Sequence, residues 1–496
     1  MPFWSIRRQG VVMPFCRALL LLVLCACPLP AAGKQRPMTV DDLLAIRSVA
    51  DVALSPDGSQ VAYVVSAANL KDNRYITDLL VQSEKGQAAR LSDGKHRHES
   101  PRWSPDGKTL AFLSDRDGKM QVWLSPVAGG RARKLTDVPA GVRDFAWAPD
   151  GQSIAYLAPD SLPKERPAVV VADRDWIRSH LHVISLQGGK ARRLTGGPLD
   201  VTAFDWSPDS KTIAYSHRPR PTPPDANETD LAIVHVAEGI SRTLVQRPGL
   251  DSFPKYSPDG KKIAFLSTQG KSAWLEDGFV CVVPAEGGKV ETVSPGHDVV
   301  FFAVDASVLH WSAQGKGIYL LAESDMTRQL FHIDIEKKTS TPATRGKAVH
   351  DRFSFSADRK KFACILESPA HPREVHLGSS ADFSVRRLTH LNEALEGIAL
   401  ATPEEYRWKA RDGMEIHGLL IKPIGWKTGT RVPVLTYVHG GPALQFAHGF
   451  SVYPPGPPQA SRYPLQVFAG RGYAIFCPNP RGSTGRGKAF RQANVA

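Results

Sequence analysis

Cysteine is scarce in this chain, and its placement excludes a zinc-bound domain and a disulfide-rich scaffold. The 496 residues contain six cysteines, three of which fall within the first 33 residues. The others, Cys281, Cys364 and Cys477, are far apart and show neither zinc-site spacing nor a disulfide framework. His96 and His98 also lack further ligands at a suitable spacing. We therefore expect no metal, and we expect the three thiols to be buried as small apolar side chains.

The chain also lacks a cluster of charges of one sign. It has 62 Lys and Arg residues against 49 Asp and Glu residues, which gives a net charge of +13. A nucleic-acid-binding protein gathers its basic residues on one face or stripe. Here they are spread singly between segments of β type, so we expect no nucleic-acid partner.

Apolar runs of membrane length are missing as well. The run at residues 18–26 follows Arg7, Arg8 and Arg17 and precedes small residues at 31–33, which is the order of an export signal. We predict that residues 1–33 are such a signal, starting at Met1 or Met13, and that the protein is periplasmic or secreted. The alternative is a lipoprotein held on the membrane through Cys27, because residues 24–27 read Leu-Cys-Ala-Cys.

The chain is rich in one repeated pattern, a tight turn between two apolar residues. Three of the seven copies read Ser-Pro-Asp-Gly and the other four vary it, each with an apolar residue three places before the third turn residue and another four places after it. Proline presets the second turn position and glycine relieves the fourth, so the pattern predicts a turn between two strands. The turn residues are Asp57, Asp106, Asp150, Asp209, Asp259, Gln314 and Asp358. We expect the aspartates to serve the turn and not chemistry.

A second hairpin pattern follows nearly every turn, so each repeat offers four short strands. Units of 44 to 59 residues with four strands are typical of propeller blades. The repeats therefore predict an all-β seven-bladed propeller over residues 34–402. A solenoid is the alternative, but its period would be shorter and stricter.

The pattern changes near Pro403. Residues 405–421 predict a hairpin with its tip at Asp412 and Gly413, and residues 432–438 form an apolar run typical of a strand covered on both faces. A helix near residues 465–470 and a strand at 473–477 follow. Residues 403–496 therefore predict the first part of an α/β domain.

Two motifs in this segment carry a family resemblance. His-Gly-Gly-Pro at residues 439–442 is followed by Asn-Pro-Arg-Gly-Ser at residues 479–483. After the blade repeats, this order resembles the prolyl oligopeptidase family of serine peptidases, in its acylaminoacyl-peptidase and dipeptidyl-peptidase branch. The resemblance implies an α/β-hydrolase domain after the propeller, short peptide substrates that reach a cavity between the domains, and no cofactor. One departure is Arg486, which stands where this branch usually has tyrosine.

The first motif suggests a chemical role of its own. Backbone N–H groups of a strand that ends in glycines can stabilise the oxyanion formed when a carbonyl is attacked. The candidate donors are Gly440 and Gly441, with His439 holding the loop by ring hydrogen bonds and Pro442 unable to donate. The alternative is a plain glycine turn. By resemblance, Asn479 and Arg481 are candidate substrate-binding residues, although Arg481 has the alternative of pairing with a carboxylate of its own domain.

The segment lacks a nucleophile. No Gly-x-Ser-x-Gly occurs in the 496 residues, and Ser451 lacks the second glycine of such an elbow. We therefore assign no catalytic residue and expect the serine, aspartate and histidine of a triad to lie downstream of Ala496. On this interpretation the chain is an inactive fragment of an exported serine peptidase. The alternative is a non-catalytic envelope propeller that binds a protein or peptide.

Overall fold

The computed structural model describes residues 35–161, 176–301, 306–441, 443–452 and 464–495. The predicted export signal, Cys27 and Pro442 lie outside these residues. Within them, most of the chain forms antiparallel strands in groups of four, which we call four-strand groups.

Three four-strand groups form separate sheets. The β2–β5 group consists of β2 (Ser48–Leu54), β3 (Gln60–Asn69), β4 (Arg74–Ser83) and β5 (Ala89–Arg90). The β6–β9 group consists of β6 (His98–Trp103), β7 (Thr109–Ser114), β8 (Gln121–Pro126) and β9 (Arg133–Lys134). The β10–β13 group consists of β10 (Asp144–Trp147), β11 (Ser153–Pro159), β12 (Ser179–Ser185) and β13 (Arg192–Arg193).

The remaining four-strand groups are joined in pairs by short parallel contacts, β16 with β18 and β24 with β26. The first pair contains β14 (Asp200–Trp206), β15 (Thr212–Arg218), β16 (Glu228–His235), β17 (Ser241–Val245), β18 (Gly249–Tyr256), β19 (Lys262–Ser267), β20 (Phe279–Pro284) and β21 (Glu291–Thr292). The second pair contains β22 (Leu309–Trp311), β23 (Gly317–Ser324), β24 (Thr327–Asp334), β25 (Thr339–Pro342), β26 (Val349–Phe355), β27 (Lys361–Ser368), β28 (His371–Ser379) and β29 (Val385–Arg387).

The repeated turn joins the first two strands of a group. In the β6–β9 group, Ser104 Oγ donates to Asp106 Oδ1 at 2.6 Å and accepts the Thr109 N–H at 2.9 Å. Gly107 takes a positive φ of 71°, a conformation that glycine adopts without strain. The aspartate therefore acts within its own turn, as the sequence suggests.

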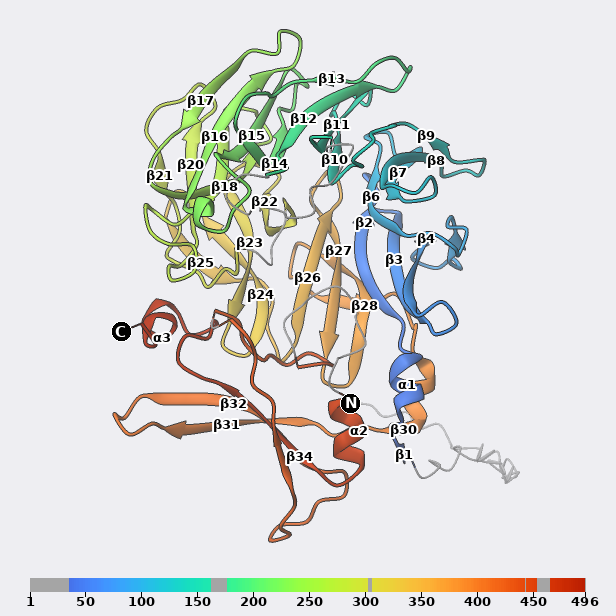
Figure 1. Ribbon diagram of the computed structural model, residues 1–496, viewed down its shortest axis with the longest axis vertical. Coiled ribbons are helices and arrows are strands. Elements are labelled where there is room, and N and C mark those ends of the chain that lie inside the picture. The colour runs from blue at the N-terminus through green and yellow to red at the C-terminus, as the bar shows by residue number, and fades with distance from the viewer. Residues whose placement is uncertain (1–34, 162–175, 302–305, 442, 453–463, 496) are drawn as a thin grey trace, which may run out of the picture.

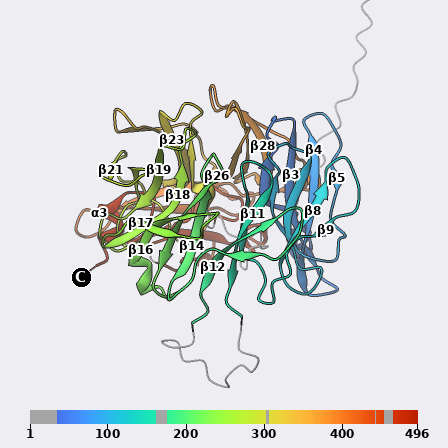
Figure 2. The same ribbon diagram turned by 90° about the horizontal axis from the view of Figure 1, so that it is seen from above.

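The turns stack on one another around a ring. The ring of Pro56 lies 3.7 Å from the position that a Cβ on Gly107 would occupy, and Pro105 lies equally close to Gly151. The first and the last four-strand groups of the ring meet at their turns as well, because the Ala357 N–H donates to the Pro56 carbonyl at 2.8 Å. Figure 2 shows the four-strand groups arranged around a ring, with β3 and β4 beside β28. The turns consequently share one face of the ring.

The core lies between neighbouring four-strand groups. One apolar cluster joins Val52 and Tyr63 of the β2–β5 group to Ile365 and Val375 of the β26–β29 group. Among the cysteines, Cys281, Cys364 and Cys477 are buried and unpaired, as expected. Burial raises the pKa of Cys477 to about 12, so this thiol is protonated at neutral pH.

Short elements connect the ring to the C-terminal segment, which we define as residues 403–495. β1 (Arg36–Pro37) pairs in parallel with β30 (Ile398–Ala399), next to α1 (Val40–Leu44). Three short 3₁₀ helices, η1 (Pro224–Asn227), η2 (Ala306–Val308) and η3 (Glu393–Gly397), lie in connections. No helix within the described residues is long and apolar enough to cross a membrane.

The C-terminal segment has a four-stranded sheet in the order β31-β32-β34-β33. It consists of β31 (Pro403–Lys409), β32 (Glu415–Ile421), β33 (Val434–Thr436) and β34 (Ala474–Asn479), with α2 (Leu465–Gly470) and α3 (Lys488–Gln492). Figure 1 shows this orange and red segment below the ring. The predicted hairpin, helix and final strand are all present.

One strand differs from the sequence-based expectation. The run at residues 432–438 was expected to be covered on both faces, yet only Val434–Thr436 pair as a strand. Val434 and Val438 are 57% and 61% exposed. The physical reason is that β33 is the edge strand, bonded to β34 alone among the described strands.

Candidate functional site

The two predicted motifs meet because β33 and β34 run parallel. The carboxyl ends of parallel neighbours lie at the same edge of a sheet. His439 follows β33 and Ser483 follows β34, and the His439 Nε2 atom lies 3.0 Å from Ser483 Oγ. Sequence positions 44 residues apart thus form one site.

The ring of His439 also fixes its own loop, because Nδ1 lies 2.8 Å from the Gly440 carbonyl oxygen. Burial lowers the pKa of His439, which favours a neutral imidazole with one N–H. A carbonyl only accepts, so the proton lies on Nδ1 and leaves Nε2 as an acceptor that faces the Ser483 hydroxyl.

The two candidate oxyanion donors stand at the surface of this loop. Gly440 and Gly441 are exposed, and neither amide donates a hydrogen bond to a described residue. Gly441 has a φ of 138°, which a side chain would strain. The loop therefore offers two N–H groups without an acceptor in the described chain. Pro442, the fourth residue of the motif, is not among the described residues.

Asn479 holds the neighbouring backbone in place. The side chain is fully buried, accepts the Phe446 N–H at 2.7 Å and donates to the Phe446 carbonyl at 3.0 Å. Both ends of the amide are thus engaged within the chain. The sequence made Asn479 a candidate for substrate binding, which stays a prediction, and in this geometry its amide holds the backbone of Phe446 within residues 443–452.

Arg481 takes one of its two expected partners. Its guanidinium pairs with Asp412 at the tip of the β31–β32 hairpin. The Met414 N–H and this guanidinium both lower the pKa of Asp412. The partner is therefore a carboxylate of the same segment.

Arg486, at the departure from the family pattern, lies against its own segment. Its guanidinium is 4.9 Å from the centre of the Phe490 ring and donates to the Glu415 carbonyl at 2.6 Å. Among the described residues, no group of three His, Cys, Asp or Glu side chains is placed to hold a metal ion.

The contacts that seat the site on the ring were missed by sequence reasoning. The Asp325 N–H donates to the Gly485 carbonyl at 2.6 Å, and Asp325 Oδ1 lies 2.9 Å from His417 Nδ1. Hydrogen bonds from His417 and Arg407 lower the pKa of Asp325 to about 2. The backbone N–H of His448 donates to the Met326 carbonyl at 2.8 Å. These partners are 82 to 160 residues apart and follow no periodic pattern, so no sequence signal indicated them.

The fold defines a class, a β-propeller followed by a segment with a four-stranded sheet. The family described as PD40, TolB beta propeller domain, matches residues 47–162. An uncharacterized peptidase of Bacillus subtilis, YuxL, is 28% identical over 92% of this chain and 73% of its own length. Dipeptidyl-peptidase 5 of Porphyromonas gingivalis is 24% identical over 93% of this chain and 71% of its own length.

Solved structures share the fold. The acylaminoacyl peptidase of Pyrococcus horikoshii superposes with a TM-score of 0.70 at 21% identity, over 91% of this chain and 68% of that one. These homologues and structural neighbours are peptidases of the prolyl oligopeptidase family.

Proposed function

We propose that this chain forms the propeller and the oxyanion-binding part of a serine-type peptidase of the prolyl oligopeptidase family, with short peptides as substrates. The observation that carries the proposal is the pair of exposed glycine amides beside the His439–Ser483 contact, at the carboxyl ends of two parallel strands. The peptidase names of the homologues support the same choice.

The chemistry assigned to the site is stabilisation of charge. Attack on a peptide carbonyl places a negative charge on its oxygen, and fixed N–H donors lower the energy of that state. Gly440 and Gly441 supply such donors, while His439 and Asn479 hold the loops that carry them. The serine nucleophile is supplied from outside these 496 residues, because no Gly-x-Ser-x-Gly occurs within them.

We also propose that the four-strand groups form seven closed blades that restrict substrates to short peptides.

Residues 1–33 are proposed to direct export to the periplasm or beyond. Mass spectrometry of the mature protein tests this: a first residue near Lys34 supports a cleaved signal, and a lipid-modified Cys27 supports a lipoprotein. An intact N-terminus in the cytoplasmic fraction contradicts both.

The absence of a nucleophile is tested with a fluorophosphonate probe. The 496-residue polypeptide should show no specific serine labelling, and a labelled serine would overturn the assignment. Reading the coding DNA beyond codon 496 in all three frames is the complementary test. A Gly-x-Ser-x-Gly followed by an aspartate and a histidine supports the proposal, whereas stop codons in every frame without them contradict it.

The donor role is tested in a polypeptide that includes such an elbow. Gly440→Pro removes one N–H and should lower kcat about 10²- to 10³-fold, as loss of an oxyanion donor does. Gly440→Ala is the matched control, because it keeps the N–H and its Cβ would meet no atom within 4 Å. Equal activity of the two variants would remove Gly440 from the oxyanion site.

A further inference from the structure

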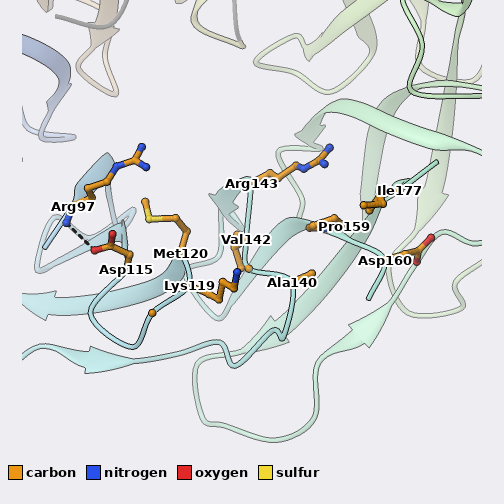
Figure 3. Close-up of a pocket in the computed structure, with 12 residues that line it drawn as sticks. Arg97, Asp115, Lys119, Met120, Ala140, Val142, Arg143, Pro159, Asp160 and Ile177 are labelled. Atoms are coloured by element: carbon orange, nitrogen blue, oxygen red, sulfur yellow. Dashed lines mark hydrogen bonds between the residues drawn. The ribbon is translucent and has the colours of Figure 1, made fainter. Parts of the chain in front are cut away.

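A cavity of about 410 Å³ lies in the ring, away from the glycine loop. Figure 3 shows it between the loops of the β6–β9 and β10–β13 groups, with Asp115 near one end and Asp160 near the other. Met120, Val142, Pro159 and Ile177 form an apolar wall, and Lys119 and Arg143 line it with cationic side chains. Its volume falls within the range of small-ligand sites, about 300–1,000 Å³.

Two cationic side chains of this cavity have no anionic partner within the described part of the chain. The side chains of Lys119 and Arg143 are exposed and form neither an ion pair nor a hydrogen bond with any described residue. Asp115 is engaged, because it accepts the Arg97 N–H at 2.8 Å.

Asp160 is engaged as well. It lies 3.4 Å from His180 Nε2 and 3.3 Å from Arg193 Nη1. The Arg97 guanidinium, also at the cavity, pairs with Glu99. Two cations therefore remain to attract an anionic ligand beside an apolar wall.

The cavity opens on the ring face that carries the C-terminal segment. The repeated turns share the opposite face, so the loops between the second and third strands share this one. In the β22–β25 group that loop contains Asp325 and Met326, which bond to Gly485 and His448. Lys119 and Met120 lie in the equivalent loop, between β7 and β8.

We propose that this cavity binds the carboxylate of a short peptide. Lys119 and Arg143 hold the carboxylate, and an apolar side chain of the peptide lies against Met120, Pro159 and Ile177. Charge complementarity selects the carboxylate. The choice of a peptide rests on the proposed function, since the cavity opens on the same face of the ring as the C-terminal segment that carries the candidate site.

Isothermal titration calorimetry of the 496-residue chain tests the proposal with three peptides. Ala-Phe-Leu with a free carboxylate should bind about tenfold or more tightly than its C-terminal amide. Ala-Phe-Glu amide distinguishes the two sources of a carboxylate. If this amide binds as tightly as the free acid, the cavity accepts the carboxylate of an acidic side chain as well as that of a chain terminus. If it binds weakly, the cavity recognises the C-terminal carboxylate of the peptide. Equal affinity for the free acid and the neutral amide, or no binding of any peptide, would overturn the proposal.

A pair of double variants locates the site. Lys119→Gln/Arg143→Gln should weaken binding of the free acid about tenfold or more. Arg131→Gln/Lys190→Gln is the matched control, because it removes the same two charges at exposed positions in hairpins of the same two groups. Equal weakening by both double variants would reduce the effect to net charge. Matching thermal midpoints exclude a folding defect.

This experiment is independent of hydrolysis. It measures binding to a chain without a serine elbow, so failure to bind would overturn only the peptide-carboxylate site. A labelled serine in the fluorophosphonate test would overturn only the proposal that the serine nucleophile lies outside these 496 residues.

Discussion

At the scale of single residues, the loops of the candidate site depend on two buried side chains. His439 keeps one proton for the Gly440 carbonyl and turns its other nitrogen to Ser483. The Ser483 hydroxyl also lies 2.7 Å from the Pro480 carbonyl, so a single hydroxyl hydrogen has two acceptors in reach. Asn479 has no such ambiguity, because each end of its amide meets one backbone group of Phe446.

Asn479→Ala should loosen residues 443–452 without unfolding the ring. The substitution leaves the N–H and carbonyl of Phe446 without partners, which costs about 1–3 kcal/mol for each buried group. Hydrogen exchange followed by mass spectrometry should show faster exchange in residues 443–452. Asn494→Ala is the control, because Asn494 is exposed. Unchanged exchange in the Asn479 variant would show that other contacts hold this backbone.

The sequence predicts part of this site and misses the rest for a physical reason. The place of His439 and Gly440 after a strand was predictable, because an apolar run that ends in glycines indicates a strand whose last backbone groups lie at a sheet edge. The partner of Asn479 was not, since Phe446 is selected by the path of an irregular segment. Such a path depends on packing and has no periodicity to read.

At the scale of elements, the repeat acts through contacts between groups as well as within them. The aromatic residue at the end of β6, Trp103, donates its indole N–H to the Ala53 carbonyl in β2 at 2.9 Å. Trp147 and Trp311 reach the preceding groups in the same way, at 3.0 and 2.9 Å. The tryptophan of the repeat thus serves the ring, which explains its fixed place before the turn.

Trp103→Phe should destabilise the contact between the β2–β5 and β6–β9 groups by about 1–2 kcal/mol, because the Ala53 carbonyl loses its donor. Trp123→Phe is a matched control, since it loses the same part of the ring while its indole nitrogen has no hydrogen-bond partner in the described chain. Urea denaturation compares the two variants. A loss for Trp123→Phe equal to that for Trp103→Phe would mean that ring packing, not the hydrogen bond, is responsible.

At the scale of the whole molecule, the C-terminal segment is seated on the ring by charges that are distant in sequence. Arg491 of α3 is buried and pairs with Asp298, and the Gly487 N–H donates to the other oxygen of Asp298 at 2.5 Å. Lys488 pairs with Glu276 at 2.9 Å. The sequence repeat predicted the ring because the repeat is local and periodic. The ion pairs between the C-terminal segment and the ring could not be predicted in this way, because they join residues about 190 to 210 positions apart.

Arg491→Met should release α3 from the ring. Removing one partner of a buried ion pair leaves Asp298 as an uncompensated charge, at a cost of about 3–5 kcal/mol. Adding Asp298→Asn should recover part of this loss, since it removes the more deeply buried of the two carboxylates that Arg491 pairs with, Asp298 and Asp277. Hydrogen exchange of residues 487–492 and of the ring loop around Glu276 measures the release. Arg486→Met is the comparison within the same segment, because Arg486 is partly exposed and should cost about 1 kcal/mol or less. Exchange in Arg491→Met equal to that of the unsubstituted chain would show that the pair does not hold the segment on the ring.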